Sequence, residues 1–129
     1  MTDTFPVSAL PESVCRMVRV LDQKKARDIR LLHVAKQTLI ADYFIICEGN
    51  TNSHLRSLSD EVEYQLSLDG VAPSHIEGHV DGNWILMDFS SVVVHLFTRE
   101  TREYYHLEKL WEDAEEIDVA PLLIQEPQA

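Results

Sequence analysis

The sequence has few of the features that usually mark an enzyme. Its four glycines are scattered, so no glycine-rich phosphate loop is present. Its two cysteines, Cys15 and Cys47, are too far apart for a CxxC zinc or redox motif. Both lie in apolar contexts, "SVCRMV" and "YFIICE". We therefore expect buried free thiols and a reducing compartment.

The six histidines form no metal-binding motif either. His75 and His79 are four residues apart, but Pro73 and Gly78 place them outside a helix, and no HExxH or paired cysteine set is present. No serine lies in a GxSxG motif, and no spacing implies an Asp or His partner for one. We therefore expect no catalytic residue, no metal site and no cofactor.

Long apolar runs are absent as well. None approaches the roughly 20 residues that a membrane-spanning helix needs. The first ten residues, "MTDTFPVSAL", contain an acid and no arginine, which is unlike a mitochondrial transit peptide, and they show no signal-peptide pattern. These features predict a cytoplasmic protein that does not attach to membranes.

Negative charge, in contrast, is abundant. The chain has 22 acidic and 11 basic residues, for a net charge of -11. Such a surface repels phosphate backbones, so direct sequence-specific binding of nucleic acid is not expected. It favours a basic protein partner through electrostatic steering. Solubility alone explains the acidity equally well.

The hydrophobic pattern predicts one α/β domain. Apolar residues recur at spacings of three and four from Pro11 to about Lys25, and again between Thr51 and Gly70, which indicates two helices. Strands are expected at about 28–35, 43–48, 73–78, 84–89 and 92–97, with a last helix at about 100–114. This order implies a mixed sheet of about five strands with helices packed on its faces.

The domain is expected to span residues 8–114. Its helical core stripes are Leu10, Val14, Met17, Val18 and Leu21 in the first helix, and Leu55, Leu58, Val62 and Leu66 in the second. In the last helix, Tyr104, Leu107 and Trp111 are predicted to form the buried stripe. Its solvated face is predicted to hold mostly Arg102, Glu103, Glu108 and Lys109, and Glu108 could form a weak surface pair with Arg102. Residues 115–129 begin acidic and end in "APLLIQEPQA", so a flexible tail is expected there.

The strand at 84–89 offers a candidate binding surface. Trp84, Leu86 and Asp88 share one face of this strand because side chains alternate along it. Tryptophan is frequent in the centres of protein interfaces, and Asp88 suits a basic side chain of a partner. The alternative is that Trp84 belongs to the core and Asp88 caps the hairpin. The sequence leaves both interpretations open.

A second candidate is the turn at residues 49–51, Gly-Asn-Thr, between a predicted strand and a predicted helix. Backbone N–H groups at such a point favour anions. A nucleotidyltransferase-type enzyme would also need paired carboxylates on a following strand to hold Mg²⁺. Asp60, Glu61 and Glu63 lie instead on the predicted helix. A capped helix is the favoured interpretation, and a nucleotide-binding enzyme is the alternative function.

Three segments together resemble the ribosomal silencing factor family, also called Iojap-related. They are "ADYFIICEGNTNSHLRSL", "HIEGHVDGNWILMDFSSVVVHLF" and "RETREYYHLEKLW", and the resemblance covers about residues 14–111. It implies an αβα sandwich that is nucleotidyltransferase-like without its metal carboxylates, and a binding module instead of an enzyme. Self-association as a homodimer is a further implication.

The resemblance also implies a partner and a mechanism. Family members bind the large ribosomal subunit through its fourteenth protein, on the face that meets the small subunit, and so block subunit joining when nutrients are limited. The residues that match the family's motifs, and that we expect to contact this basic ribosomal protein, are Glu77, Trp84, Leu86, Asp88, His95 and Tyr104.

Overall fold

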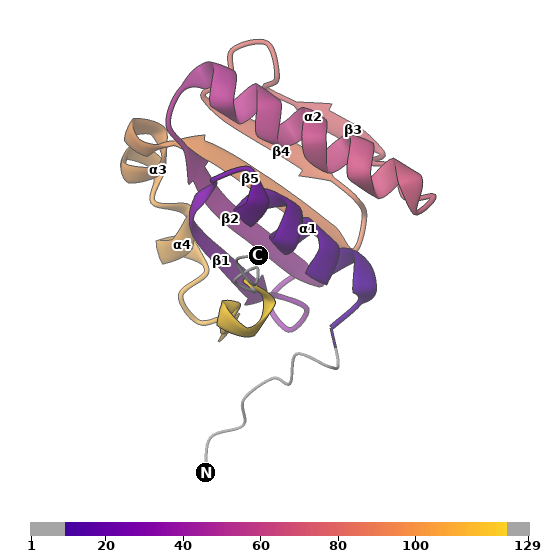
Figure 1. Cartoon of the computed structure of the whole chain (residues 1–129). Helices are drawn as coiled ribbons and strands as arrows, with labels where there is room; N and C mark the ends of the chain where they lie inside the picture. Colours follow the sequence, from indigo (N-terminus) through magenta and orange to yellow (C-terminus); the bar gives the residue numbers. More distant parts are fainter. Residues whose placement is uncertain (1–9, 124–129) are drawn as a thin grey trace.

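The computed structural model describes residues 10–123 as a mixed sheet with helices on both of its faces (Figure 1). The longer elements are α1 (Glu12–Gln23), β1 (Arg27–His33), β2 (Tyr43–Gly49), α2 (Asn52–Leu68), β4 (Trp84–Asp88), β5 (Val92–Thr98) and α3 (Arg99–Tyr105). The shorter ones are β3 (His75–Glu77), α4 (Leu107–Leu110), β6 (Glu115–Ile117) and the 3₁₀ turn η2 (Ala120–Leu122).

The six strands lie in the order β3-β4-β5-β2-β1-β6. Only the central pair, β2 and β5, is parallel; every other neighbouring pair is antiparallel. All seven residues of β5 are buried, as are six of the seven in β2. This burial agrees with the near-continuous apolar runs of these two segments, which are typical of strands covered on both faces.

Helices α1 and α2 pack side by side on one face of the sheet, and Figure 1 shows both in front of the strands. Every member of the two predicted helical stripes is buried. Thr51 caps α2 by accepting a hydrogen bond from the backbone N–H of His54. The sequence offered either Thr51 or Asn52 for this role. Both cysteines are free and buried here, and burial raises the pKa of Cys47 to about 12.

The opposite face has a smaller cover. Leu107 of α4, with Trp111 and Ala114, packs against the cluster around Leu32 and Phe44 on β1 and β2. The β4 side chains on this face, in contrast, remain only half-buried. The αβα arrangement is therefore confirmed, but the second helical layer is short and leaves one side of the sheet accessible.

The sequence predicted one last helix, but the structure contains two shorter ones, α3 and α4. His106 adopts φ 50° and ψ 50°, a left-handed conformation that ends α3 and starts α4. His is among the few residue types that tolerate this region, but the sequence pattern alone does not indicate it. The break turns Leu107 and Trp111 onto the sheet, whereas Tyr104 is 82% exposed and not part of the core stripe.

Residues 115–123 also differ from the expected flexible tail. Glu115–Ile117 form β6, which pairs antiparallel with β1 and makes a sixth strand. Ile117 and Leu122 are buried in the main core. The remaining tail residues, 124–129, lie outside the described part of the chain. Between residues 10 and 123, no helix has the length and apolar character to cross a membrane.

Candidate docking surface

Strand β4 alternates between the two sides of the sheet. Ile85 and Met87 are fully buried under α2, while Trp84, Leu86 and Asp88 point to the other side and are half-buried. Tyr105 of α3 reaches Trp84, but all three side chains remain partly exposed to solvent. We call the surface formed by Glu77, Trp84, Leu86 and Asp88 the open face.

The strand register brings the other predicted sheet residues to the same side. Leu86 pairs with Glu77 of β3 on one flank and with His95 of β5 on the other. Glu77 is exposed and pairs through its Oε2 with Nε2 of His75. All five candidates predicted on strands therefore share one face, although 18 positions of sequence separate Glu77 from His95.

Aromatic rings extend the open face onto α3. The ring of Trp84 lies 4.9 Å from that of Phe97 and 4.9 Å from that of Tyr105, measured between centroids. Tyr105 in turn contacts Tyr104 edge-on at 5.0 Å. Tyr104 is thus connected to Trp84 through Tyr105. Sequence reasoning missed Tyr105 because no spacing rule links it to the sheet.

The sequence left open whether Trp84 is a core residue or an exposed contact for a partner, and the structure gives it both characters. Its indole Nε1–H donates a hydrogen bond to Nδ1 of His95 at 3.2 Å, across the paired strands. The polar edge of the ring is therefore turned inward, and its packing against Phe97 and Tyr105 holds the ring in place. The side chain is nevertheless only half-buried, so part of Trp84 is also exposed to solvent.

His95 is more buried than the sequence suggested. It is 5% exposed, and burial lowers its pKa to about 4 because the charged imidazolium loses its hydration. Its Nδ1 accepts from Trp84, so the neutral ring carries its proton on Nε2. That Nε2 has no hydrogen-bond partner. His95 therefore supports the ring of Trp84 from below instead of lying on the surface.

Asp88 caps the hairpin, which was one of the two roles that the sequence allowed for it. Its Oδ1 accepts a hydrogen bond from the backbone N–H of Ser90, a residue with φ 75°. The side chain stays half-buried beside His75 of the paired strand. A cap of this kind leaves the second carboxylate oxygen of Asp88 able to accept from another donor.

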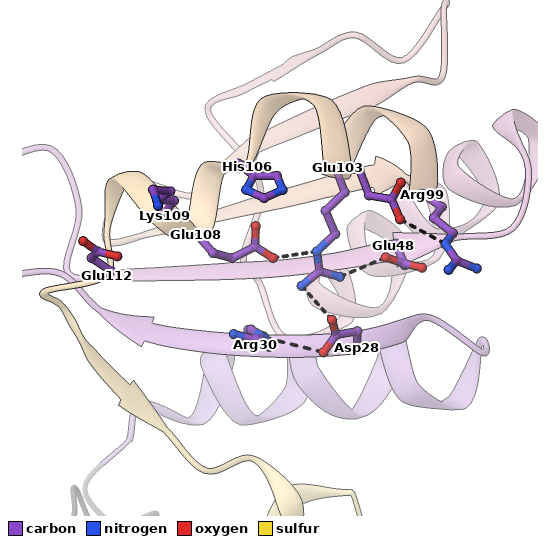
Figure 2. Close-up of a pocket in the computed structure, with 10 residues that line it drawn as sticks. Asp28, Arg30, Glu48, Arg99, Glu103, His106, Glu108, Lys109 and Glu112 are labelled. Atoms are coloured by element: carbon purple, nitrogen blue, oxygen red, sulfur yellow. Dashed lines mark hydrogen bonds and ion pairs between the residues drawn. The ribbon is translucent and has the colours of Figure 1, made fainter.

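The predicted solvated face of the last helix holds an ion-pair cluster around a buried arginine instead. Arg102 is only 6% exposed and pairs with three carboxylates. These three acids, Asp28, Glu48 and Glu108, are labelled in Figure 2. Glu108 lies 2.6 Å away, and Glu48 and Asp28 each lie 3.3 Å away. Arg102 therefore ties α3 to α4, β2 and β1, and the prediction that it is solvated was wrong.

A cavity of about 560 Å³ adjoins this cluster, lined by ten side chains of which nine carry a charge at neutral pH. These are Asp28, Arg30, Glu48, Arg99, Arg102, Glu103, Glu108, Lys109 and Glu112, with His106 as the tenth. Five of them are acidic and four are basic, and several of them pair with each other. The cluster therefore links elements of the same domain through ion pairs, and it offers no surface of uniform charge to a ligand.

The turn at residues 49–51 is already filled by the protein's own groups. The backbone N–H of Asn50 donates to Nδ1 of His54 at 2.9 Å, and Nε2 of His54 lies 2.8 Å from the carbonyl oxygen of Lys24. A phosphate would have to displace this ring. Within residues 10–123, no three His, Cys, Asp or Glu side chains come close enough together to hold a metal ion.

Comparison with known proteins shows the family to which this chain is related. A family model described as "Ribosomal silencing factor during starvation" matches residues 7–129. A ribosomal silencing factor of Bacillus subtilis is 41% identical over 93 residues, which cover 72% of this chain and 79% of that protein. One from Halalkalibacterium halodurans is 36% identical, covering 79% of this chain and 87% of that protein.

Solved structures agree with these sequence relatives. A crystal structure of a Chromobacterium violaceum protein superposes with a TM-score of 0.76 at 30% identity, covering 91% of this chain and 88% of that one. One from Bacillus halodurans gives 0.73 at 30% identity, covering 84% and 99%. The chain belongs to the ribosomal silencing factor family.

Proposed function

We propose that this protein represses translation by binding the large ribosomal subunit at its inter-subunit face and excluding the small subunit. The docking partner is a basic ribosomal protein, the fourteenth of the large subunit, and the open face is the contact surface. Repression serves conditions of nutrient limitation. Family membership supports this proposal, and the starvation response is part of the description of the matching family.

The observation that carries the proposal is the composition of the open face. Leu86 lies next to both carboxylates, with Glu77 opposite it on β3 and Asp88 two residues along β4. Trp84 lies on the other side of Leu86, and exposed Tyr104 extends the surface. An apolar centre with a charged rim is the usual anatomy of a protein interface. The acidic rim and the net charge of -11 complement a basic partner and disfavour rRNA.

Occlusion needs no chemistry. A domain of this length has a radius of gyration of roughly 14 Å, which is too thick for the gap between closely apposed subunits. A specific complex needs only about 800 Å² of this surface buried on the partner. We therefore expect a regulator without catalytic activity, acting in the cytoplasm. Self-association as a homodimer remains a prediction, which light scattering of the purified chain tests.

Co-sedimentation with purified large subunits, followed by a subunit-joining assay, tests the proposal. We expect the protein to sediment with large but not small subunits and to lower the yield of joined ribosomes in proportion to its occupancy. Normal joining at saturating protein would overturn the proposal. Calorimetry with nucleoside triphosphates and Mg²⁺ tests the alternative enzyme function, for which the occupied turn at Asn50 and His54 predicts no heat of binding.

A further inference from the structure

A small pocket opens on the open face at the edge of the sheet. Its volume is about 210 Å³, and its walls are Glu77, Gly78, Trp84 and Leu86. β3 is the outermost strand of the sheet on this side, so a partner can approach the pocket from the edge. It is separate from the larger cavity beside Arg102, with which it shares no lining residue.

The backbone makes the pocket's edge tight. Gly78 has φ 82°, and a Cβ atom built on it would stand 2.0 Å from the carbonyl oxygen of Trp84. Only glycine therefore permits the β3–β4 connection to run this close to Trp84. The backbone of the β3–β4 connection therefore lies directly against the first residue of β4 at this wall of the pocket.

The walls are chemically asymmetric. Trp84 directs its indole N–H to His95, so this polar edge is already engaged and the ring carbons are left for a ligand. Leu86 adds an aliphatic surface. Glu77 is the one charged group, with its side chain 63% exposed, and the contact of His75 with Oε2 orients the carboxylate. A ligand for this pocket must be long, apolar along its stem and positive at its end.

We infer that the pocket receives a single arginine side chain of the basic partner. The inference rests on the proposed function and specifies how the open face grips its partner. The aliphatic stem packs on Leu86, the planar guanidinium lies against the ring of Trp84, and an N–H pair is directed to Glu77. Arginine is preferred over lysine because the guanidinium stacks on aromatic faces and bonds a carboxylate in two places.

Anionic ligands do not fit the same site. Glu77 would repel a carboxylate or phosphate, and no basic side chain lines the pocket. The net charge of -11 adds a long-range repulsion to the local one. The same field attracts a basic protein and steers an arginine at its surface toward the edge of the sheet.

The first test compares the affinity for purified large subunits of the wild-type chain, Glu77→Gln and Glu63→Gln. Glu77→Gln keeps the side-chain shape and removes the charge, and we expect it to weaken binding by about tenfold. Glu63 is an exposed acid on α2, on the other side of the sheet, and serves as the matched control with less than about a twofold effect. Equal affinities for all three proteins would overturn the inference.

The second test needs no ribosome. N-acetyl-arginine methylamide and its lysine counterpart are titrated into the ¹⁵N-labelled chain, and the Trp84 indole and Gly78 amide signals are followed by NMR. We expect saturable shifts at both positions with arginine, weaker ones with lysine, and at least about a threefold loss of arginine affinity in Glu77→Gln. Uniform shifts, or the same response to both compounds, would contradict the inference.

The two tests separate failure of the pocket from failure of the function. If the wild-type chain does not bind large subunits, the proposed function is wrong, and the arginine titration alone decides about the pocket. If the chain binds subunits but neither Glu77→Gln nor the arginine probe has the expected effect, the function stands and the pocket assignment falls.

Discussion

Trp84 and His95 are joined by a hydrogen bond of 3.2 Å from the indole Nε1–H to the imidazole Nδ1, across two antiparallel strands. This bond needs a neutral imidazole, because a protonated ring has no acceptor nitrogen. The pair therefore couples the shape of the open face to the protonation state of one buried side chain.

The first prediction concerns acid stability. Burial lowers the pKa of His95 to about 4, whereas the unfolded chain has the ordinary value near 6.5. The unfolded state thus binds the proton more readily, so stability is complete above about pH 6.5 and is lost as the pH falls toward 4. Urea unfolding at pH 5 should show a loss of roughly 2 kcal/mol from this group relative to pH 7.

Other groups also titrate in this range, so the same measurement on His95→Leu is the control. The variant cannot take up the proton, and we expect its stability to change with pH less steeply than that of the wild type, by about the same 2 kcal/mol. Parallel pH profiles for the two proteins would contradict the assignment of the titration to His95.

The second prediction concerns the ion-pair cluster of Figure 2. Arg102→Met removes the one cation that three carboxylates share, and should lower the free energy of unfolding by about 3 kcal/mol in urea. Arg99→Met is the matched control, because Arg99 is 72% exposed and pairs only with Glu103 one turn away on the same helix. We expect less than about 0.5 kcal/mol there. Similar losses for both variants would mean that the cluster contributes no more than a surface pair.

The third prediction uses two exposed tyrosines. Tyr104 is 82% exposed on α3 beside the open face, and Tyr64 is 57% exposed on α2 on the other side of the sheet. Tyr104→Ala should weaken binding to large subunits by about tenfold, while Tyr64→Ala should leave it unchanged. Because both side chains are exposed, neither substitution should change the midpoint of thermal unfolding appreciably. An equal effect of both on binding would place the contact surface elsewhere.

The fourth prediction tests the tight wall of the edge pocket. A Cβ atom at Gly78 meets the Trp84 carbonyl at 2.0 Å, whereas one at Gly70 meets nothing within 4 Å, although both glycines have positive φ. Gly70→Ala should cost about 1 kcal/mol of stability, from backbone strain alone. Gly78→Ala adds the clash and should cost about 3 kcal/mol in the same thermal or urea assay. Equal costs would show that the β3–β4 connection yields easily.

Local patterns in the sequence predicted much of this structure. The stripes of α1 and α2 and the alternation along β4 follow from spacing, and each is present in the fold. The cap of α2 follows from the polar residues at its start, of which Thr51 is the one used. The sharing of one face by Glu77, Trp84 and His95 needed the strand register as well. That register depends on pairing between segments that the sequence shows only one at a time.

The features that escaped prediction depend on distant partners. β6 is a strand only because it pairs with β1, more than 80 residues earlier in the chain, and its own residues are mostly acidic. The position of Arg102 on its helix predicts a solvated side chain, but its carboxylate partners Asp28 and Glu48 come from β1 and β2, which are distant in the sequence. The helix break at His106 likewise accompanies the Arg102–Glu108 contact across it.

The parallel pairing of β2 with β5 has a consequence for the timing of activity. Tyr43 pairs with Val92, so the ribosome must synthesise about fifty further residues before the centre of the sheet can close. Such non-local pairing makes folding slow compared with helical domains. His95 and Phe97, which contact the ring of Trp84, both belong to β5. The open face is therefore incomplete in a nascent chain until β5 has been synthesised and has paired with β2.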